Sequence, residues 1–379
     1  MKRYHRAAAS EFLGDFIVYR NLIPVDQRLP AFTKIHQELN LPLHSTPRKS
    51  SPDYAQVITR ILTAARALDA PQAVIKRLIF IGDTRMNDGT AFVNICRAGG
   101  WPGFAFIGTE KDQPEQIEIV DAGHGRSLYI ANRWSALAEF ETYLTQLHFP
   151  IDEGTVVLID MDKTMLGARG RNDGVIDQAR VDAAFQTVST ALGDDFNAPN
   201  FDAAYRRFNQ PAFHAFTSDN QDYLVYICLI IASGLFELET FTKRVQSGRL
   251  ANFSDFLVNV DSQLDQLPSK LHAIHRDVFS CFEAGDPTPF KAFRRKEYQI
   301  TAARMGNLAP DSPLDMVLNQ EIVITQEVRV AALTWRQQGA LVFGLSDKPD
   351  EASIPTDTLA KLGYLPLHQI TTDVVGDGA

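Results

Sequence analysis

Two aspartates stand two positions apart directly after an apolar run. Residues 156–159 are hydrophobic and lead into Asp160, Met161 and Asp162. On an extended backbone residues i and i+2 point to the same side, so we expect both carboxylates at the end of a buried strand, where open α/β sheets bind their ligands. Neighbouring carboxylates repel unless they share a cation or a proton. The pair predicts a metal or acid/base site; the simpler alternative is two solvated aspartates.

A second apolar run ends in a similar way. Residues 78–81 are followed by Gly82 and Asp83, and Asp88 comes five residues after Asp83. Glycine allows other groups to approach the backbone closely, and carboxylate oxygens suit Mg²⁺. We therefore expect Asp83 and Asp88 in a metal site. The alternative for Asp88 is that it only caps the helix that begins near Thr90.

Two further residues have the chemistry to bind phosphate. Ser346 follows an apolar run at 341–345, and its hydroxyl and the next backbone donors could bind a phosphoryl oxygen. Lys49 lies between Pro47 and Pro52 at the entrance of a helix pattern, where its ammonium could neutralise a phosphate or a carboxylate. Taken alone, either residue is explained equally well as an ordinary loop residue without a role in binding.

The elements that carry these residues are predicted from hydrophobic patterns. Five short apolar runs are continuous rather than alternating, which is typical of strands covered on both faces in a parallel sheet. Amphipathic segments at 54–68 and 134–147 lie between them and predict helices. We therefore expect an α/β fold with a doubly wound parallel sheet. The five predicted strands are 78–81, 104–107, 128–130, 156–159 and 341–345.

The middle of the chain has a different character. Between about 175 and 338 there is no comparable strand run, only a succession of helical patterns, so a large α-helical domain interrupts the α/β chain. We expect residues 1–166 and 338–379 to form the α/β core and residues 167–337 to form the insertion. The predicted helices are 176–192, 221–231, 236–245, 269–283, 291–305 and 314–336.

Composition excludes several classes of protein. The 379 residues include 37 Lys and Arg against 46 Asp and Glu, a net charge of −9, which argues against nucleic acid or an anionic membrane as the main partner. The three cysteines are widely separated, which indicates a reducing compartment without disulfides or a zinc knuckle. The most apolar stretch, 223–236, is shorter than the ~20 residues that span a bilayer. We therefore expect a cytoplasmic protein without a membrane partner.

At these four sites the chain resembles the haloacid dehalogenase superfamily. That superfamily has a strand ending in D-x-D-x-T/V, a strand ending in Ser or Thr, a Lys at a helix start, and a G-D-x-x-x-x-D motif. The Asp-Lys-Pro that follows the second motif also looks like members of the phosphoglycolate phosphatase kind. The matching residues here are Asp160, Asp162 and Thr164 for the first motif, Ser346 for the second, Lys49 for the third, and Gly82, Asp83 and Asp88 for the fourth.

The order of the motifs differs from that of the family. Here the third and fourth motifs precede the first, and the second lies near residue 346, so only the cyclic order is kept. We infer a circular permutation with the cut between the second and third motifs. The helical insertion lies between the first and second motifs, where the family has its cap. Two degenerate domains, or a domain-swapped dimer that builds the site from two chains, are the alternative topologies.

The resemblance implies both a metal and a mechanism. Asp160 would be the nucleophile that forms an aspartyl-phosphate, and Asp162 the general acid and then the base. Ser346 and Lys49 would stabilise the phosphoryl oxygens. The implied Mg²⁺ ligands are Asp160, the backbone carbonyl of Asp162, Asp83 and Asp88.

The expected function is therefore a Mg²⁺-dependent phosphatase that acts on a small phosphorylated metabolite. In the family, the second aspartate of the first motif, here Asp162, is typical of phosphoryl transfer rather than dehalogenation. One alternative is a phosphotransferase or mutase, which release of phosphate in buffer would distinguish. Another is a weakly active binding or regulatory protein with the same fold.

Weaker signals remain beside the motifs. Arg169 and Arg171 follow the first motif and are candidates to recognise an anionic substrate. A basic cluster in the helical domain is a second candidate, although a solvated helix face is the usual interpretation of such a cluster. His272 and His275 could contact one metal ion from neighbouring turns of a helix, or simply face solvent. The basic cluster comprises Lys291, Arg294, Arg295 and Lys296.

Overall fold

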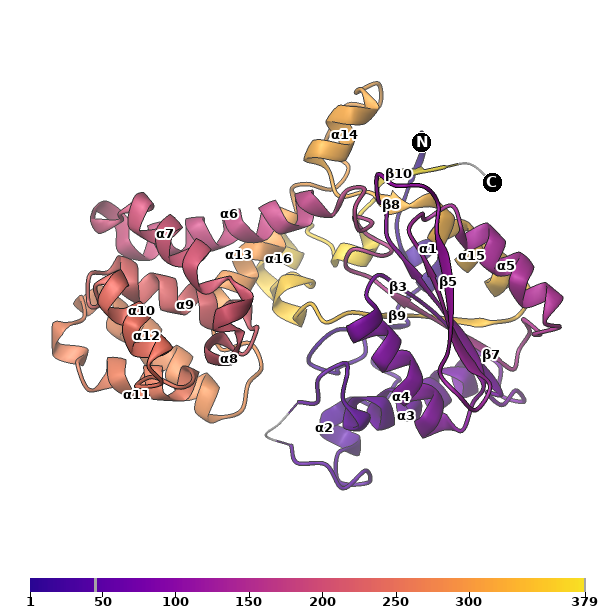
Figure 1. The fold of residues 1–379 in the computed structure, drawn as a ribbon, viewed down its shortest axis with the longest axis horizontal. Helices are drawn as coiled ribbons and strands as arrows, with labels where there is room; N and C mark the ends of the chain where they lie inside the picture. The colour runs from indigo at the N-terminus through magenta and orange to yellow at the C-terminus, as the bar shows by residue number, and fades with distance from the viewer. Residues whose placement is uncertain (44–45, 378–379) are drawn as a thin grey trace. The chain divides into compact units, whose positions relative to one another are not determined.

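The computed structural model describes residues 1–43 and 46–377. It has a mixed α/β fold that divides into two compact units. The first, which we call the α/β unit, comprises Met1–Gln178 and Thr301–Ala379, and the second, the helical unit, comprises Ala179–Ile300 (Figure 1). None of the helices in the described ranges combines the length and the apolar character needed to cross a membrane.

A seven-stranded sheet forms the centre of the α/β unit. Six of its strands are parallel, and β5 pairs antiparallel with β6 at one edge. Each of the five predicted apolar runs is one of these strands, so the predicted α/β class with a parallel sheet is confirmed. The order across the sheet is β2 (Ile17–Val18), β9 (Leu341–Leu345), β7 (Thr155–Asp160), β3 (Arg77–Gly82), β4 (Gly103–Gly108), β6 (Arg126–Ala131) and β5 (Ile117–Asp121).

Helices cover both faces of this sheet, which explains why its central strands are continuously apolar. Phe80 and Leu158 belong to the same buried cluster as the inner faces of two helices on one side. Phe106 points to the opposite side, where its ring centroid lies 5.7 Å from that of Phe140. The helices are α3 (Pro52–Asp69) and α4 (Thr90–Gly99) on the first face and α1 (Ser10–Leu13), α5 (Leu137–Gln146) and α15 (Gln326–Gln337) on the second (Figure 1).

The register of the three central strands determines where the motifs meet. Ile159 of β7 pairs with Ile81 of β3, and Asp160 pairs with Leu345 of β9. The residues that follow these strands therefore emerge at one edge of the sheet. This edge is formed by the carboxyl ends of parallel strands, the usual ligand-binding position in open α/β sheets.

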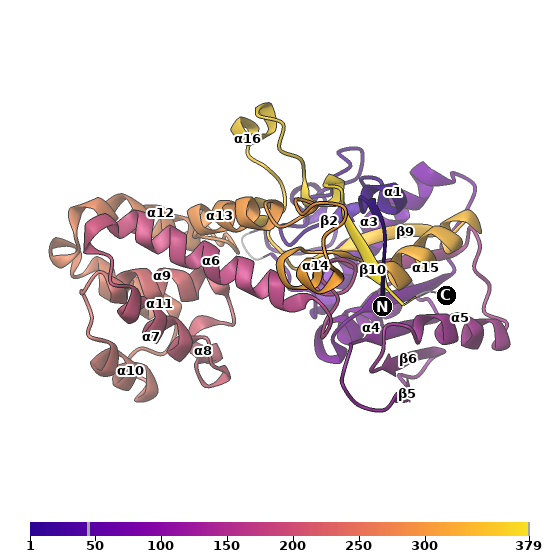
Figure 2. The same ribbon diagram turned by 90° about the horizontal axis from the view of Figure 1, so that it is seen from above.

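A second, three-stranded sheet joins distant parts of the α/β unit. β1 (Lys2–Ala7) is antiparallel to β10 (Thr372–Gly376), and β10 is parallel to β8 (Ile324–Thr325). The first and last strands of the described chain are therefore neighbours (Figure 2), and the amino group of Met1 lies 2.7 Å from Oδ1 of Asp377.

The predicted helix at 314–336 was wrong. The chain instead forms α14 (Leu314–Gln320), then β8, then α15. The interruption coincides with the apolar β-branched run 322–324, which favours extended structure. Ile324 pairs with Val374 of β10 and forms a bridge with Leu166.

The helical unit has its own hydrophobic core around α9 (Gln221–Ala232), most of whose side chains are buried. The chain passes between the units within α6 (Asp173–Leu192) and α13 (Lys291–Ala302). Residues 167–178 and 301–337, which we expected in the insertion, lie in the α/β unit, and the second of these ranges contains β8 and α15. The remaining helices of the unit are α7 (Ala198–Phe208), α8 (His214–Thr217), α10 (Leu238–Gln246), α11 (Phe253–Asp261) and α12 (Ser269–Glu283).

Two of the weaker sequence signals are part of this helical core. Arg294 is buried and makes ion pairs of 2.7 Å with both Asp222 and Glu297, so it is no solvated face residue. His275 is fully buried, and its Nδ1 lies 2.5 Å from the hydroxyl of Tyr226. Nε2 of His272 instead contacts the backbone carbonyl of Leu267 at 2.8 Å. The two histidines therefore have separate partners.

Candidate active site

Three of the predicted aspartates meet at the carboxyl edge of the sheet. One carboxylate oxygen from each of Asp83, Asp88 and Asp160 lies within 4.8 Å of the others. Within the described residues this is the one group of three or more His, Cys, Asp or Glu side chains close enough to hold a metal ion. All three side chains are less than a tenth exposed. We call these three residues the carboxylate cluster.

Lys49 reaches the carboxylate cluster from the entrance of α3. Its Nζ lies 2.5 Å from Oδ1 of Asp160 and 2.7 Å from Oδ1 of Asp88, and the side chain is 1% exposed. The hydroxyl of Ser51 caps α3 by accepting a hydrogen bond from the backbone N–H of Tyr54. Lys49 is thus a buried counter-ion of the cluster and not a solvated loop lysine.

Asp88 organises the loop that contains it. Its Oδ2 accepts hydrogen bonds from the backbone N–H of Asp83 at 3.0 Å and from the N–H and hydroxyl of Thr84, both at 2.9 Å. A Cβ at Gly82 would lie 2.5 Å from Cβ of Asp88, so glycine is required there. The N-cap residue of α4 is Gly89, and the Asp88 carboxylate accepts hydrogen bonds from residues before the helix, so Asp88 does not act as a simple helix cap. The carboxylate folds the loop back onto the end of β3.

Asp83 has a cationic partner that the sequence analysis did not pair with it. Nε of Arg169 donates a hydrogen bond to Oδ2 of Asp83. The Asp83 side chain is 6% exposed, whereas that of Arg169 is 37% exposed. The guanidinium therefore lies at the solvent boundary of the carboxylate cluster.

Burial and mutual repulsion act against the charged forms of the aspartates in the carboxylate cluster. Burial raises the pKa of Asp160 well above its usual value, and Lys49 only partly opposes this. Burial and the neighbouring Asp88 raise the pKa of Asp83 to about 7. Burial also acts against the charged form of Asp88, but Lys49 and the hydrogen bonds to the carboxylate outweigh it and lower its pKa to about 2. The cluster thus tends to take up a proton, or another cation, at neutral pH.

The loop after β9 contributes Ser346 beside the cluster-bearing strands. Its hydroxyl accepts a hydrogen bond of 3.0 Å from the backbone N–H of Lys348, and the side chain is buried. Nζ of the buried Lys348 lies 3.7 Å from Oδ1 of Asp162. The amide of Asn87 donates to Oδ2 of Asp347 at 2.9 Å, which joins this loop to the loop of Asp88.

Asp162 lies beyond the end of β7, outside the extended backbone that its spacing from Asp160 assumed. β7 ends at Asp160, and the chain turns between Met161 and Leu166, with Lys163 in the left-handed region at φ 66°. The Asp162 carboxylate is therefore outside the carboxylate cluster and lies next to Lys348. Its side chain is 25% exposed, the most open of the four motif aspartates.

Sequence reasoning missed two contacts of this site. The first is that of Lys348 with Asp162, although Lys348 lies only two residues after Ser346. Arg169 was considered as a substrate-binding residue but not as a partner of Asp83. For Lys348 and Arg169 the signal lay in their nearness to a motif, while their partners lie far away in sequence. Thr164, a residue of the first motif, has a buried hydroxyl with no hydrogen-bond partner among the described residues.

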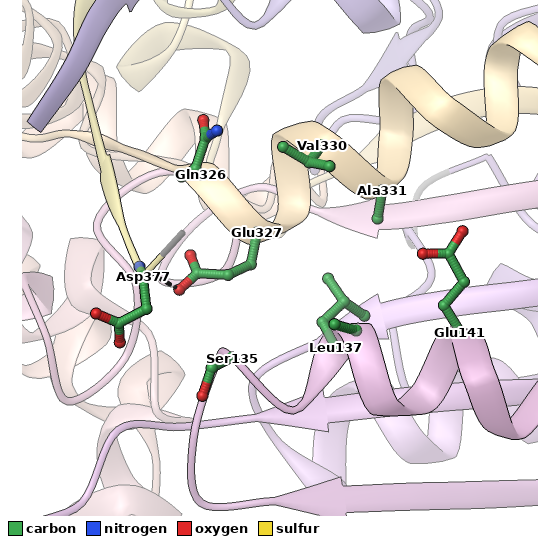
Figure 3. Close-up of a pocket in the computed structure, with 9 residues that line it drawn as sticks. Ser135, Leu137, Glu141, Gln326, Glu327, Val330, Ala331 and Asp377 are labelled. Carbon is green, nitrogen blue, oxygen red and sulfur yellow. Dashed lines mark hydrogen bonds between the residues drawn. The ribbon is translucent and has the colours of Figure 1, made fainter. Parts of the chain in front are cut away.

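A separate pocket of about 90 Å³ lies between α5 and α15 (Figure 3). Its acidic side chains already have partners. Glu327 accepts a hydrogen bond from the N–H of Asp377 and pairs with Arg171, and Glu141 accepts one from the indole N–H of Trp335. None of the predicted site residues lines it.

No known family model matches the chain, and neither a curated protein nor a solved structure matches it. Function is therefore argued from the chemistry of the site.

Proposed function

We propose that the protein is a Mg²⁺-dependent phosphatase of the haloacid dehalogenase type with a circularly permuted motif order. It would hydrolyse a small phosphorylated metabolite through an aspartyl-phosphate on Asp160. The observation that carries the proposal is the convergence of Asp160, Asp83 and Asp88 with Lys49 at the carboxyl ends of adjacent parallel strands. These are the groups that phosphoryl transfer needs: a nucleophile, cation ligands and a buried positive charge.

The donor set fits a divalent cation. When all three are ionised, the carboxylates carry three negative charges against the two positive charges of Lys49 and Arg169, and hard oxygen donors are the ligands that Mg²⁺ prefers. Asp160 and Asp83 would hold the ion together with the backbone carbonyl of Asp162, and Asp88 would support them. When bound, Mg²⁺ would offset the negative charge shared by the phosphate and the carboxylates.

Asp160 is suited to be the nucleophile. Lys49 engages its Oδ1, which leaves Oδ2 as the oxygen that attacks phosphorus. In the first step the bond from Oδ2 to phosphorus forms, and the bond from phosphorus to the leaving alcohol oxygen breaks. Water then attacks phosphorus, which releases phosphate and restores the carboxylate.

Asp162 is suited to move the proton in both steps. It would protonate the leaving alcohol and later accept the proton of the attacking water. Its partial exposure gives it access to solvent, and the ammonium of Lys348 at 3.7 Å holds its carboxylate beside the second-motif loop. Ser346 and Lys49 would hydrogen-bond the non-bridging phosphoryl oxygens.

The strand arrangement supports the permuted order. β7 of the first motif lies between β9 of the second and β3 of the fourth, all within one sheet of one chain. Two degenerate domains would not have this arrangement, and no exchange between chains is needed to assemble the site. β1 and β10 are neighbours, as a cut between the second and third motifs requires. The helical unit would then be the cap.

The proposal is tested by release of phosphate from an aryl phosphate with and without Mg²⁺. We expect metal-dependent turnover in the native protein and its loss in Asp160→Asn. Asp112→Asn serves as the control because Asp112 is an exposed aspartate outside the site, and it should behave like the native protein. Full turnover by Asp160→Asn would refute the nucleophile. A folded native protein that releases no phosphate from aryl or alkyl esters would refute the phosphatase.

A further inference from the structure

Arg169 is held at the carboxylate cluster by its backbone. Its N–H donates to the carbonyl of Lys163 at 2.7 Å. Its own carbonyl accepts from the N–H of Glu110 at 2.8 Å and from the indole N–H of the fully buried Trp134 at 3.1 Å. Gly170, at φ 78°, follows it, and a Cβ there would lie 2.0 Å from the carbonyl oxygen of Glu110. The base of this side chain is therefore fixed.

The head of the Arg169 side chain is more open than its base. The side chain is 37% exposed and binds Asp83 through one nitrogen, Nε. Arg171 in the same loop provides the contrast, because its side chain is fully buried and pairs with Glu110 and Glu327 at 3.0 and 2.9 Å. Of the two arginines, Arg171 is part of the packing, and Arg169 has a guanidinium that can exchange partners without moving the backbone.

Asp83, the partner of Arg169, also belongs to the proposed metal site. In the proposed function Asp83 is a ligand of the divalent cation, and an oxygen that binds a cation is a poor acceptor for a guanidinium beside it. A bound cation therefore competes with Arg169 for Asp83. Because its backbone is fixed, the released guanidinium stays at the edge of the site, where a phosphate ester arrives.

Building on the proposed function, we propose that Arg169 is an exchangeable counter-ion. It occupies Asp83 in the metal-free protein, gives up Asp83 when a divalent cation binds, and then binds the phosphate of the substrate. The metal and the anionic substrate would consequently bind in order, with the metal first. Arg169 would lower the affinity for the metal and raise the affinity for the anion.

The test uses one substitution and two titrations. For Arg169→Gln, we expect calorimetry to show that Mg²⁺ binds about tenfold more tightly, because its competitor is gone. Orthophosphate, added in the presence of saturating Mg²⁺, should bind about tenfold more weakly. If Arg169 had a purely structural role, its replacement would weaken the binding of both Mg²⁺ and orthophosphate. Weaker binding of both, or no change in either affinity, would overturn the inference.

Arg85→Gln is the matched control. Arg85 is also near the loop of Asp88, but its side chain is 57% exposed and its partner is Glu118 at 3.7 Å. Its loss should change neither affinity by more than about twofold. If Mg²⁺ binds the native protein and Arg169→Gln leaves both affinities unchanged, the exchange by Arg169 is refuted while the proposed metal site still stands. If Mg²⁺ binds neither the native protein nor Arg169→Gln, the proposed metal site fails as well.

A measurement on the native protein removes any dependence on how the variant folds. The Nε–H resonance of Arg169, observed by NMR with ¹⁵N-labelled arginine, should shift when Mg²⁺ is added and again when orthophosphate follows. A resonance that moves with neither addition would contradict the exchange.

Discussion

Replacement of Asp83 by asparagine should stabilise the metal-free α/β unit. The side chain of Asp83 is 6% exposed, and burial together with Asp88 raises its pKa to about 7 from 3.8. Asparagine has nearly the same shape but no charge to bury. Although Asp83 is a proposed functional residue, its ionised form costs the folded protein free energy when no metal is bound.

The magnitude follows from the pKa difference. A rise from 3.8 to about 7 is roughly three units, or about 4 kcal/mol at 1.36 kcal/mol per unit. This pKa already includes the favourable effect of Arg169 on the charged form, so nothing further is subtracted for the lost pair. We therefore expect Asp83→Asn to raise the free energy of unfolding by about 4 kcal/mol at pH 8.

The sign of the pH dependence is fixed by the direction of the shift. Below pH 3.8 Asp83 is protonated in both states and contributes nothing. Between pH 3.8 and about 7 the folded state keeps the proton that the unfolded state loses, so the contribution of Asp83 to stability falls as pH rises. The advantage of the variant should therefore shrink to about 2 kcal/mol at pH 5.

The assay is urea unfolding in EDTA at pH 5 and pH 8, followed by tryptophan fluorescence. All three tryptophans, Trp101, Trp134 and Trp335, belong to the α/β unit, so the signal reports on that unit. Asp112→Asn is the control for loss of a charge alone. Mg²⁺ should reduce the difference in unfolding free energy between the variant and the native protein at pH 8, because it stabilises the native protein more than the variant. A destabilised Asp83→Asn at pH 8 would refute the reasoning.

Three further substitutions test other parts of the site. Lys49→Met leaves Asp160 and Asp88 buried without their cation, so urea unfolding at pH 7 should show a loss of about 3 kcal/mol that is partly recovered at pH 5. Ser346→Ala removes a buried hydroxyl that would donate a hydrogen bond to the phosphate. The kcat for an aryl phosphate should therefore fall about 10–100-fold, while the free energy of unfolding in urea should change by about 1 kcal/mol. Gly170→Ala forces a side chain into a left-handed position against a carbonyl oxygen, so thermal unfolding should show a loss of about 3 kcal/mol.

The central sheet could be predicted because its strands are buried on both faces. Such strands are continuous apolar runs, and the polar residue that ends each run marks the edge where ligands bind. The approach of Asp160 to Asp83 followed from this rule, since parallel neighbours end at the same edge. The short strands gave no such signal. β2 and β8 have two residues each, and β5 mixes mostly exposed apolar and acidic residues at the sheet edge.

The contacts that complete the site could not be predicted from local patterns. Lys49 lies 39 residues from Asp88 and 111 from Asp160, so its burial depends on packing between distant segments. Arg169 lies 86 residues from Asp83. The spacing rule does not fix the position of Asp162, because the strand ends at Asp160 and the alternation of an extended backbone ends with it.

The position of β9 has a consequence for the order in which the protein folds during synthesis. β9 lies between β2 and β7, and both of these are made before the helical unit, whereas β9 is made after it. A chain emerging from the ribosome can therefore pair β7 with β3 and bring Lys49 to Asp160 early. The other edge of β7 stays open until β9 arrives, and an open apolar edge invites pairing with other chains. Ser346 arrives with β9, so the chain has its carboxylates long before it can have the complete site.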